Sequence, residues 1–333
     1  MLRIGLIGCG DYCSRAHAKC LSEMPEAHIV AISECVYAGE LEQRQRQFRI
    51  PYAFQRYEEM LRRVDLDGVV ITTPHAFHFA QVRSCLERGL HVLLDKPPAC
   101  HVGEIQSLVN LAHSAGRHLV VASQRRYNPV FRRWRDQVQA GELGELRFVR
   151  IHYGRDRYQN FAASWRNNLV LSGGGVLFDA GYHFLDSLLW VTGCRPLCAH
   201  GSLGRHGTEV ETCVSLALEL EGNVQVNISL HLEMAQHVVQ EEIDLLGTRG
   251  ALIYQYVSCH DTAPSAQLVT VQAGYQKREE VPRNASIDQA PAKNFISAIL
   301  GQEAVVSSGR DSIETVRTIE WIYRELQARD RVR

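Results

Sequence analysis

Residues 2–10 read LRIGLIGCG, a short apolar run that ends in the glycine pair Gly8 and Gly10. An almost continuous apolar run of this length predicts a strand that is buried on both faces. In this position Gly8 would permit a tight turn into a helix, and Gly10 would let the backbone approach a pyrophosphate at the helix N-terminus. The same two glycines are also compatible with a tight turn that binds no ligand, so a dinucleotide site has to be inferred from further residues.

Similar apolar runs recur over the next 120 residues or so. Helix-length segments separate the predicted strands, which cover 2–7, 28–32, 68–72, 91–94 and 118–121. Repeated alternation of strand and helix predicts a doubly wound parallel sheet with right-handed crossovers. We therefore expect residues 1–122 to form a dinucleotide-binding domain.

The remaining residues, 123–333, predict a second domain that contains helices and a sheet. A helix is expected over 129–140, then an irregular stretch up to Gly175, and then a helix to Val191. Apolar and polar residues alternate over 213–220 and 224–230, and further strands are expected near 238–246, 251–257 and 267–271, followed by helices near 294–300 and 312–326. Such alternation is typical of a large, mostly antiparallel open sheet with one exposed face. That face is a candidate interface for a homodimer or a homotetramer.

Charge and composition argue against several classes of protein. The 333 residues carry a formal net charge of -1, which gives no general attraction to nucleic acid or to an anionic membrane. No apolar run approaches the roughly 18 residues of a membrane span, and the N-terminus resembles a strand rather than a signal peptide. The ten cysteines form no C-x-x-C pair, which favours a reducing compartment. We expect a soluble, cytoplasmic protein.

Further candidate cofactor residues lie in the first turn and after the second strand. A carboxylate at Glu34 would accept hydrogen bonds from the ribose hydroxyls of NAD and repel a 2'-phosphate. We place Asp11, Tyr12 and Cys13 in the same site, and Cys13 occupies the position of the usual third small residue. NAD is thus expected rather than NADP, although Arg44, Arg46 or Arg49 could fold back toward the ribose. Glu34 could equally be an ordinary solvated carboxylate at a strand end.

Three further signals are expected where ligands bind open α/β sheets. Thr73-Pro74 follows the third predicted strand, with His78 on the next helix, and Lys96-Pro97 follows the fourth, where a cis peptide is common enough to be considered. The third signal is the glycine run 173–175, which leads into Asp179 and His183; these two are four residues apart and share a helical face. Lys96 is one of only four lysines among 36 basic residues, which supports a specific role.

Taken together, these motifs resemble the Gfo/Idh/MocA family of oxidoreductases over nearly the whole chain. The matching motifs are Gly8-Cys9-Gly10 with His17, Thr73-Pro74 with His78, Asp95-Lys96-Pro97, Arg125-Arg126-Tyr127-Asn128-Pro129, Trp165-Arg166, and Gly173-Gly174-Gly175 leading to Asp179, Gly181 and His183. The chain departs from the family pattern at Cys13 and at Asp95, which replaces the usual Glu and could hold Lys96 differently.

The resemblance implies an N-terminal Rossmann domain and a C-terminal α/β domain that has an open sheet and binds substrate. It also implies reversible oxidation of a secondary alcohol on a sugar or a cyclitol. His183 would be the general acid/base, because an imidazole titrates near neutral pH. Lys96 would stabilise developing alkoxide charge on the same oxygen. Asp179 would either orient a second hydroxyl or tune His183.

The substrate itself is less defined. Arg126 lies at the domain junction, where it could reach cofactor or substrate, and Tyr153, Trp165 and Arg166 precede the glycine run. Arginines 155, 157 and 166 suggest a phosphate or a nucleotide sugar, while the aromatic residues suit either a sugar face or ordinary packing. Two alternatives remain: a non-sugar substrate such as a dihydrodiol or a bilin, and a dinucleotide-binding regulator without turnover. A metal site is not expected, because His75 and His78 have no identifiable third ligand.

Overall fold

The computed structural model describes residues 1–34, 38–259, 265–272, 274–282 and 286–330. Its chain divides into two units, Met1–Tyr127 with Ala285–Val316 and Asn128–Asn284 with Arg317–Arg333. The expected domains, 1–122 and 123–333, differ from these units because Ala285–Val316 returns to the first. The division into a dinucleotide-binding domain and a substrate-binding domain stays a prediction.

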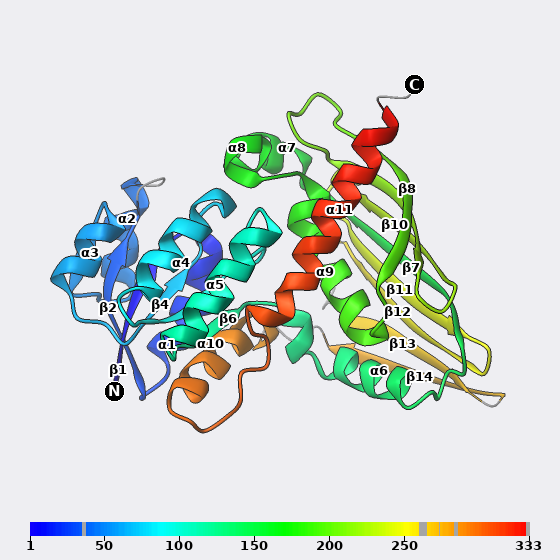
Figure 1. The fold of residues 1–333 in the computed structure, drawn as a ribbon, viewed down its shortest axis with the longest axis horizontal. Coiled ribbons are helices and arrows are strands. Elements are labelled where there is room, and N and C mark those ends of the chain that lie inside the picture. Colours follow the sequence, from blue (N-terminus) through cyan, green and yellow to red (C-terminus); the bar gives the residue numbers. More distant parts are fainter. Residues whose placement is uncertain (35–37, 260–264, 273, 283–285, 331–333) are drawn as a thin grey trace. The chain divides into compact units, whose positions relative to one another are not determined.

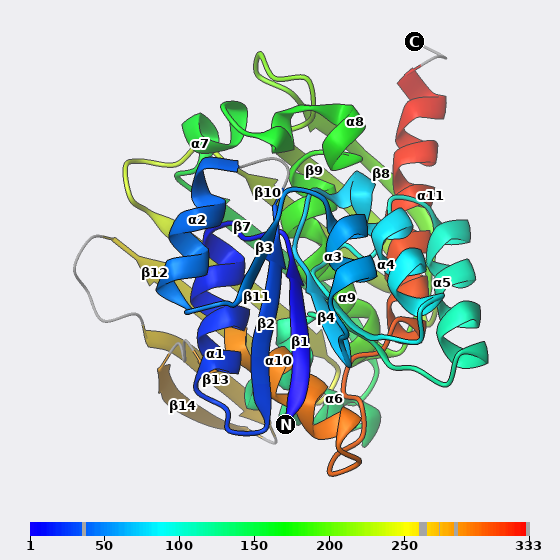
Figure 2. The ribbon, with the colours of Figure 1, turned by 90° about the vertical axis from the view of Figure 1, so that its left-hand side faces the viewer.

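The first unit contains a six-stranded parallel sheet with the strand order β3-β2-β1-β4-β5-β6 (Figures 1 and 2). Its strands are β1 (Leu2–Ile7), β2 (Ala27–Ser33), β3 (Tyr52–Phe54), β4 (Gly68–Ile71), β5 (His91–Leu94) and β6 (Leu119–Val121). This order is that of a doubly wound dinucleotide-binding sheet, so the predicted fold class is confirmed. The short edge strand β3 was not predicted, because three partly exposed residues are too few for a periodic pattern.

Helices on both sides of this sheet complete the first unit. A π-helical segment, η1 (Cys13–Ala18), continues into α1 (Lys19–Ser22); α2 (Ala38–Gln47), α3 (Tyr57–Arg63), α4 (His78–Leu86) and α5 (Val102–Ser114) follow. Helix α10 (Ser286–Ile299) starts earlier than predicted and packs on η1 and α1. Phe295 of α10 is fully buried, and a Cβ atom added to Gly68 would lie 3.0 Å from its Cζ. A late segment of the chain therefore closes the core around the first strands.

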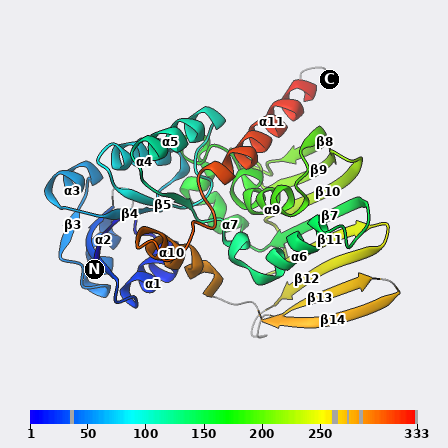
Figure 3. The same cartoon turned by 60° about the horizontal axis from the view of Figure 1, so that its bottom comes forward.

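The second unit is built on an eight-stranded sheet with the order β14-β13-β12-β11-β7-β10-β9-β8 (Figure 3). Its strands are β7 (Leu146–Arg155), β8 (Pro196–Gly204), β9 (Cys213–Leu220), β10 (Val224–His231), β11 (Val239–Gly247), β12 (Gly250–Ser258), β13 (Ser265–Gln272) and β14 (Tyr275–Pro282). All neighbours are antiparallel except β7 and β10. The predicted mostly antiparallel sheet is confirmed.

The prediction of an irregular stretch before Gly175 is wrong for its first part. Strand β7 lies there, in the middle of the sheet, with Val149 and Ile151 buried and Arg150 exposed between them. Arginines at 147, 150 and 155 disguised the alternation. The edge strands β8 and β14 were not predicted either. The rest of the stretch forms short helical turns: α7 (Tyr158–Ala162), η4 (Trp165–Asn167) and α8 (Leu169–Ser172).

Helices cover one face of this sheet. Helix α9 (Val176–Thr192) packs on β9 and β10, and α6 (Pro129–Gln139) packs against α9 (Figure 1). Helix α11 (Ile313–Asp330) begins in the first unit and ends in the second. A Cβ on Gly181 of α9 would lie 3.1 Å from Leu230 Cδ1, so the glycine permits close packing of helix on sheet. The opposite face of the sheet carries no helix among the described residues of this unit.

Candidate active site

The turn after β1 has the conformation that the glycine pair predicts. Gly8 has φ +89°, and a Cβ there would lie 3.0 Å from backbone atoms of both Thr72 and Thr73. Only glycine combines this conformation with this close approach. A Cβ on Gly10, in contrast, would meet no atom within 4 Å, so open space adjoins the backbone where a pyrophosphate is expected.

The third position of the turn is used for packing. Cys13 is 1% exposed, and burial raises its pKa to about 12, so the thiol is neutral and acts as a small apolar side chain. The Arg15 guanidinium lies 4.9 Å from the centroid of the Tyr12 ring, and the His17 ring is nearly perpendicular to it at a centroid distance of 5.4 Å. Its hydroxyl accepts a hydrogen bond from the amide of Gln124, which ties the turn to η3 (Gln124–Tyr127).

Glu34 lies directly against the glycine turn. The residue is 4% exposed, and its Oε2 accepts a hydrogen bond of 2.8 Å from the backbone N–H of Cys9. A solvated carboxylate at a strand end would not be buried in this way. The carboxylate, the open side of Gly10 and the start of the following helix fit a dinucleotide.

Arg44 also reaches this turn from α2. Its Nε donates to the carbonyl oxygen of Cys9 at 3.3 Å, and its Nη2 lies 2.6 Å from Asp11 Oδ1 and 3.5 Å from Glu40 Oε2. Of the three arginines that could fold back toward the ribose, the structure places Arg44 at the turn. The backbone N–H of Cys9 is therefore bound by the Glu34 carboxylate, and its carbonyl oxygen is bound by the Arg44 guanidinium.

His78 connects the ends of β4 and β5. Its side chain is fully buried, with Nδ1 2.9 Å from Pro97 O and Nε2 2.9 Å from Thr73 O. Burial lowers the pKa of His78 to about 4, although both backbone carbonyls oppose this shift. A neutral imidazole has one N–H and donates only one of these bonds. His78 thus acts on the site through the backbone that it holds.

Lys96 follows β5 at the same edge. Its side chain is partly buried, its N–H donates to Asp95 Oδ1 at 2.9 Å, and the Lys96–Pro97 peptide is cis. At the end of β4, Thr73 is 6% exposed and donates its hydroxyl hydrogen to Gln81 Oε1 at 2.6 Å, while Pro74 precedes the turn η2 (His75–Phe77). The buried imidazole of His78 therefore connects the backbone at Thr73 with the backbone at Pro97, next to Lys96.

Arg126 is held inside the first unit. It is 5% exposed, its Nη2 donates to the carbonyl oxygen of Asp311 at 3.1 Å, and its Nη1 lies 3.7 Å from Asp311 Oδ1. Asp311 belongs to the turn η5 (Arg310–Ser312). Binding of cofactor or substrate by Arg126 stays a prediction, since its guanidinium is engaged by Asp311.

The other candidate substrate residues lie in the second unit. Asp179 and His183 are on α9, and Asp179 is 9% exposed. The Nε of Arg166 donates to Asp179 Oδ2 at 3.0 Å, and the Arg166 guanidinium lies 4.5 Å from the centroid of the Trp165 ring. Trp165, Arg166 and Asp179 therefore form one connected group.

Two more side chains lie close to this group. Burial lowers the pKa of Arg157; the negative charge of Asp179 opposes this shift, and the positive charges of Arg166 and Arg155 add to it. Tyr153 also acts to raise the pKa of Arg157, and the centroid of its ring lies 5.3 Å from that of the Phe184 ring.

The glycine run before α9 has a local cause that sequence reasoning missed. The side chain of Glu211 and the hydroxyl of Tyr323 occupy the space beside Gly174 and Gly175. Nothing in the sequence marks Glu211, because it precedes an alternating strand as an ordinary polar residue would.

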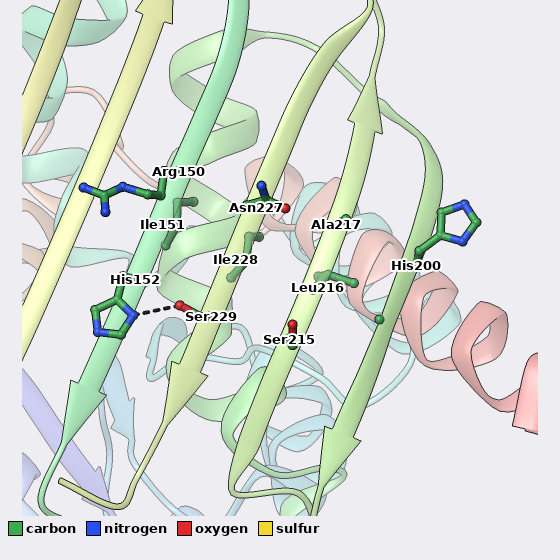
Figure 4. A pocket seen from close by; sticks show the side chains of 11 residues that line it. Arg150, Ile151, His152, His200, Ser215, Leu216, Ala217, Asn227, Ile228 and Ser229 are labelled. Atoms are coloured by element: carbon green, nitrogen blue, oxygen red, sulfur yellow. Dashed lines mark hydrogen bonds between the residues drawn. The ribbon is translucent and has the colours of Figure 1, made fainter.

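A hollow of about 460 Å³ lies on the outer face of the second sheet (Figure 4). Strands β7, β8, β9 and β10 line it with small and polar side chains, among them His152, Ser215, Ala217, Asn227 and Ser229. His152 Nδ1 and Ser229 Oγ are 2.7 Å apart within it. Arg150 at its edge is neutralised by Asp244 at 2.7 Å and Glu242 at 2.9 Å.

The described ranges contain neither a membrane-spanning helix nor a group of metal-binding side chains. In these ranges, no helix has both the length and the apolar character that crossing a membrane requires. No group of three His, Cys, Asp or Glu side chains in the same ranges is placed to hold a metal ion.

Comparison with known proteins identifies the family. Residues 2–123 match the model of the Gfo/Idh/MocA oxidoreductase family with an NAD-binding Rossmann fold, and residues 131–253 match the model of the C-terminal domain of the same family. The chain belongs to the Gfo/Idh/MocA family of NAD(P)-binding oxidoreductases. The family assignment made from the motifs is confirmed.

Individual relatives differ in what they act on. The chain is 28% identical over 194 residues to the rhizopine catabolism protein MocA of Rhizobium meliloti, with 58% of each chain aligned. It is 29% identical over 226 residues to trans-1,2-dihydrobenzene-1,2-diol dehydrogenase of Mus musculus. This alignment covers 67% of this chain and 66% of the relative. These matches thus span less than two thirds of either relative.

A solved structure matches nearly the whole fold. The WlbA dehydrogenase of Bordetella pertussis, in complex with NADH and UDP-GlcNAcA, superposes with a TM-score of 0.82 over 98% of this chain and 97% of that chain. Sequence identity is 21%, so this likeness concerns the fold.

Proposed function

We propose that this Gfo/Idh/MocA oxidoreductase transfers hydride between a nicotinamide cofactor and a CH–OH carbon of an anionic sugar, such as a sugar phosphate or a nucleotide sugar. The observation that carries the substrate class is the group around Asp179, where Arg166 binds the carboxylate at 3.0 Å and Arg157 is close enough for Asp179 to affect its pKa. Two guanidinium groups beside one carboxylate leave positive charge for a substrate anion. The aromatic ring of Trp165, under Arg166, would suit a sugar face.

The chemistry assigned to Lys96 and His183 is part of the same proposal. The nicotinamide, when bound, supplies the acceptor or donor of hydride. His183 takes the hydroxyl proton during oxidation and returns it during reduction. Lys96 donates a hydrogen bond to the same oxygen and stabilises its developing negative charge. Asp179, held by Arg166, orients a neighbouring hydroxyl.

A second candidate function is oxidation of a non-sugar diol. The similarity to the mouse dihydrodiol dehydrogenase favours it, because this relative is matched over 226 residues. The scaffold and the two proposed catalytic residues would be the same, and the positive charge near Asp179 would then have no substrate partner.

A panel of substrates separates these candidates. We expect kcat/KM to be at least about tenfold higher on phosphorylated or nucleotide-linked hexoses than on the free hexoses, since a charge-assisted hydrogen bond contributes about 1.5–3 kcal/mol. Reduced nicotinamide is followed by its absorbance, with cyclitols and a trans-dihydrodiol in the same panel. Equal efficiency on charged and neutral sugars contradicts the anionic substrate, turnover of the dihydrodiol alone supports the second candidate, and no turnover with either cofactor contradicts the proposed function.

Loss of either proposed catalytic side chain should greatly slow turnover without loss of cofactor binding. Lys96→Ala and His183→Ala are each expected to lower kcat by about 10²–10⁴-fold while the Kd for NAD changes little. Lys277→Ala on β14 and His28→Ala on β2 remove exposed side chains of the same types and serve as controls. Near-normal turnover by His183→Ala over the whole pH range would contradict its acid/base role.

We further propose NAD as the preferred cofactor. Glu34 would accept hydrogen bonds from the ribose hydroxyls, and Arg44, on the other side of the Cys9 peptide, would allow weaker use of NADP.

Opposite effects of two substitutions test this preference. Glu34→Ala is expected to raise KM for NAD about tenfold or more with little effect on NADP, whereas Arg44→Ala should raise KM for NADP more than for NAD. Arg46→Ala is the control, because the Arg46 guanidinium pairs with Glu42 at 2.8 Å on the same helix. If Glu34→Ala changed both values equally, Glu34 would not select the cofactor.

The outer face of the second sheet is proposed as the interface of a homodimer or homotetramer. The hollow lined by β7, β8, β9 and β10 and its small side chains support close approach of another surface. Light scattering measures the mass in solution, and a monomer at micromolar concentration would contradict this assembly.

A further inference from the structure

Glu211 lies buried against the first turn of α9. It is 5% exposed, and its Oε1 accepts hydrogen bonds from Gly175 N at 3.0 Å, Leu177 N at 3.1 Å and the Tyr323 hydroxyl at 2.5 Å. Its own carbonyl oxygen accepts from Val176 N at 2.8 Å. The first N–H groups of a helix have no partner within the helix. One residue therefore binds three consecutive N–H groups at the start of α9.

The glycine run makes room for this contact. A Cβ on Gly175 would lie 2.0 Å from the carbonyl oxygen of Glu211, and a Cβ on Gly174 would lie 2.5 Å from the Tyr323 hydroxyl oxygen. Gly173 has φ +75° where α8 ends. Any side chain at 174 or 175 would displace Glu211 or Tyr323. The run is therefore a tightly packed socket for these two residues.

Within the socket, Tyr323 is the hydrogen-bond donor and Glu211 the acceptor. Burial raises the pKa of Glu211, and the hydrogen bonds from Tyr323 and from the backbone oppose this shift without reversing it. Burial, together with the nearby Glu211 charge, raises the pKa of Tyr323 well above 10, so its hydroxyl keeps its proton. A negative charge at this end of a helix is also stabilised by the helix dipole.

The socket is linked directly to the candidate catalytic residues. The backbone N–H of Asp179 donates to the carbonyl oxygen of Gly175 at 2.9 Å, and the amide of Gly175 is itself bound by Glu211. His183 follows Asp179 by one turn of the same helix. Any shift of Gly175 therefore moves the first turn of α9 and the side chains that it presents.

We infer that Glu211 is a positioning residue: it fixes the start of α9 and so sets where Asp179 and His183 stand toward the substrate. This inference rests on the proposed function, in which these two side chains act on the substrate. Tyr323 completes the socket. A misplacement of about 1 Å at a catalytic group can lower a rate by about 10²-fold.

Four variants test the inference. Glu211→Ala removes the acceptor, Glu211→Gln keeps an acceptor oxygen in the same place, and Tyr323→Phe removes one donor while keeping the ring. Asn128→Ala is the matched control, because Asn128 caps α6 in the same unit with a hydrogen bond of 2.9 Å from Val130 N.

Steady-state kinetics and amide hydrogen exchange are measured on each variant well below its Tm. Glu211→Ala should lower kcat by about 10–100-fold and raise KM for the substrate, while KM for NAD stays within about twofold. Glu211→Gln should retain kcat within a few-fold, and Tyr323→Phe should fall between them. Exchange should rise in the segment 176–182 of Glu211→Ala, whereas Asn128→Ala should lower Tm with kcat unchanged.

The outcomes are separable. Unchanged kcat and exchange in Glu211→Ala would overturn the inference, as would an equal loss of kcat in Asn128→Ala at the same fall in Tm. If Glu211→Ala does not fold, Tyr323→Phe decides: wild-type kinetics and exchange there would overturn the inference. If the wild-type protein turns over no substrate, the proposed function fails, and hydrogen exchange still decides whether Glu211 fixes the start of α9.

Discussion

The close approach of the chain at Gly8 to the end of β4 is the constraint on which the cofactor edge depends. A Cβ at Gly8 would lie 3.0 Å from the backbone of Thr72 and Thr73, and only a glycine with φ +89° allows this contact. The strand ends are joined there by backbone hydrogen bonds of 2.9 Å, from Gly8 N to Ser33 O and from Thr72 N to Ile7 O. Three neighbouring strands therefore end together at one place.

The positions of the candidate cofactor residues follow from this junction. Glu34 comes next after Ser33, so its carboxylate reaches the N–H of Cys9. Thr73 comes next after Thr72, and its carbonyl oxygen meets His78, which also lies 2.9 Å from Pro97 O. The backbone around Lys96 is thus tied to the glycine turn by a buried imidazole. In the second unit, the carboxylate of Glu211 holds the backbone at the start of α9 by hydrogen bonds from Gly175 N and Leu177 N.

The sequence predicted those features that depend on neighbouring residues. Continuous apolar runs indicated the parallel strands, and the turn at Gly8 with Glu34 after β2 was found because both lie at strand ends. Strand β7 was missed because its exposed arginines hide the alternation of Val149 and Ile151. Contacts between residues far apart in the chain could not be predicted: Arg126 is engaged by Asp311, and Glu211 packs into a glycine run 36 residues away. These contacts depend on the folded topology, which no local pattern carries.

Calorimetric titration of Gly8→Ala with NADH tests the central constraint most directly. A Cβ at Gly8 is expected to push the turn away from Thr72 and Thr73 and to weaken NADH binding at least about tenfold. Gly116→Ala is the control, since Gly116 has φ +63° with no atom within 4 Å of an added Cβ, and it should bind NADH as the wild type does. Unchanged NADH affinity in a folded Gly8→Ala variant would contradict the account.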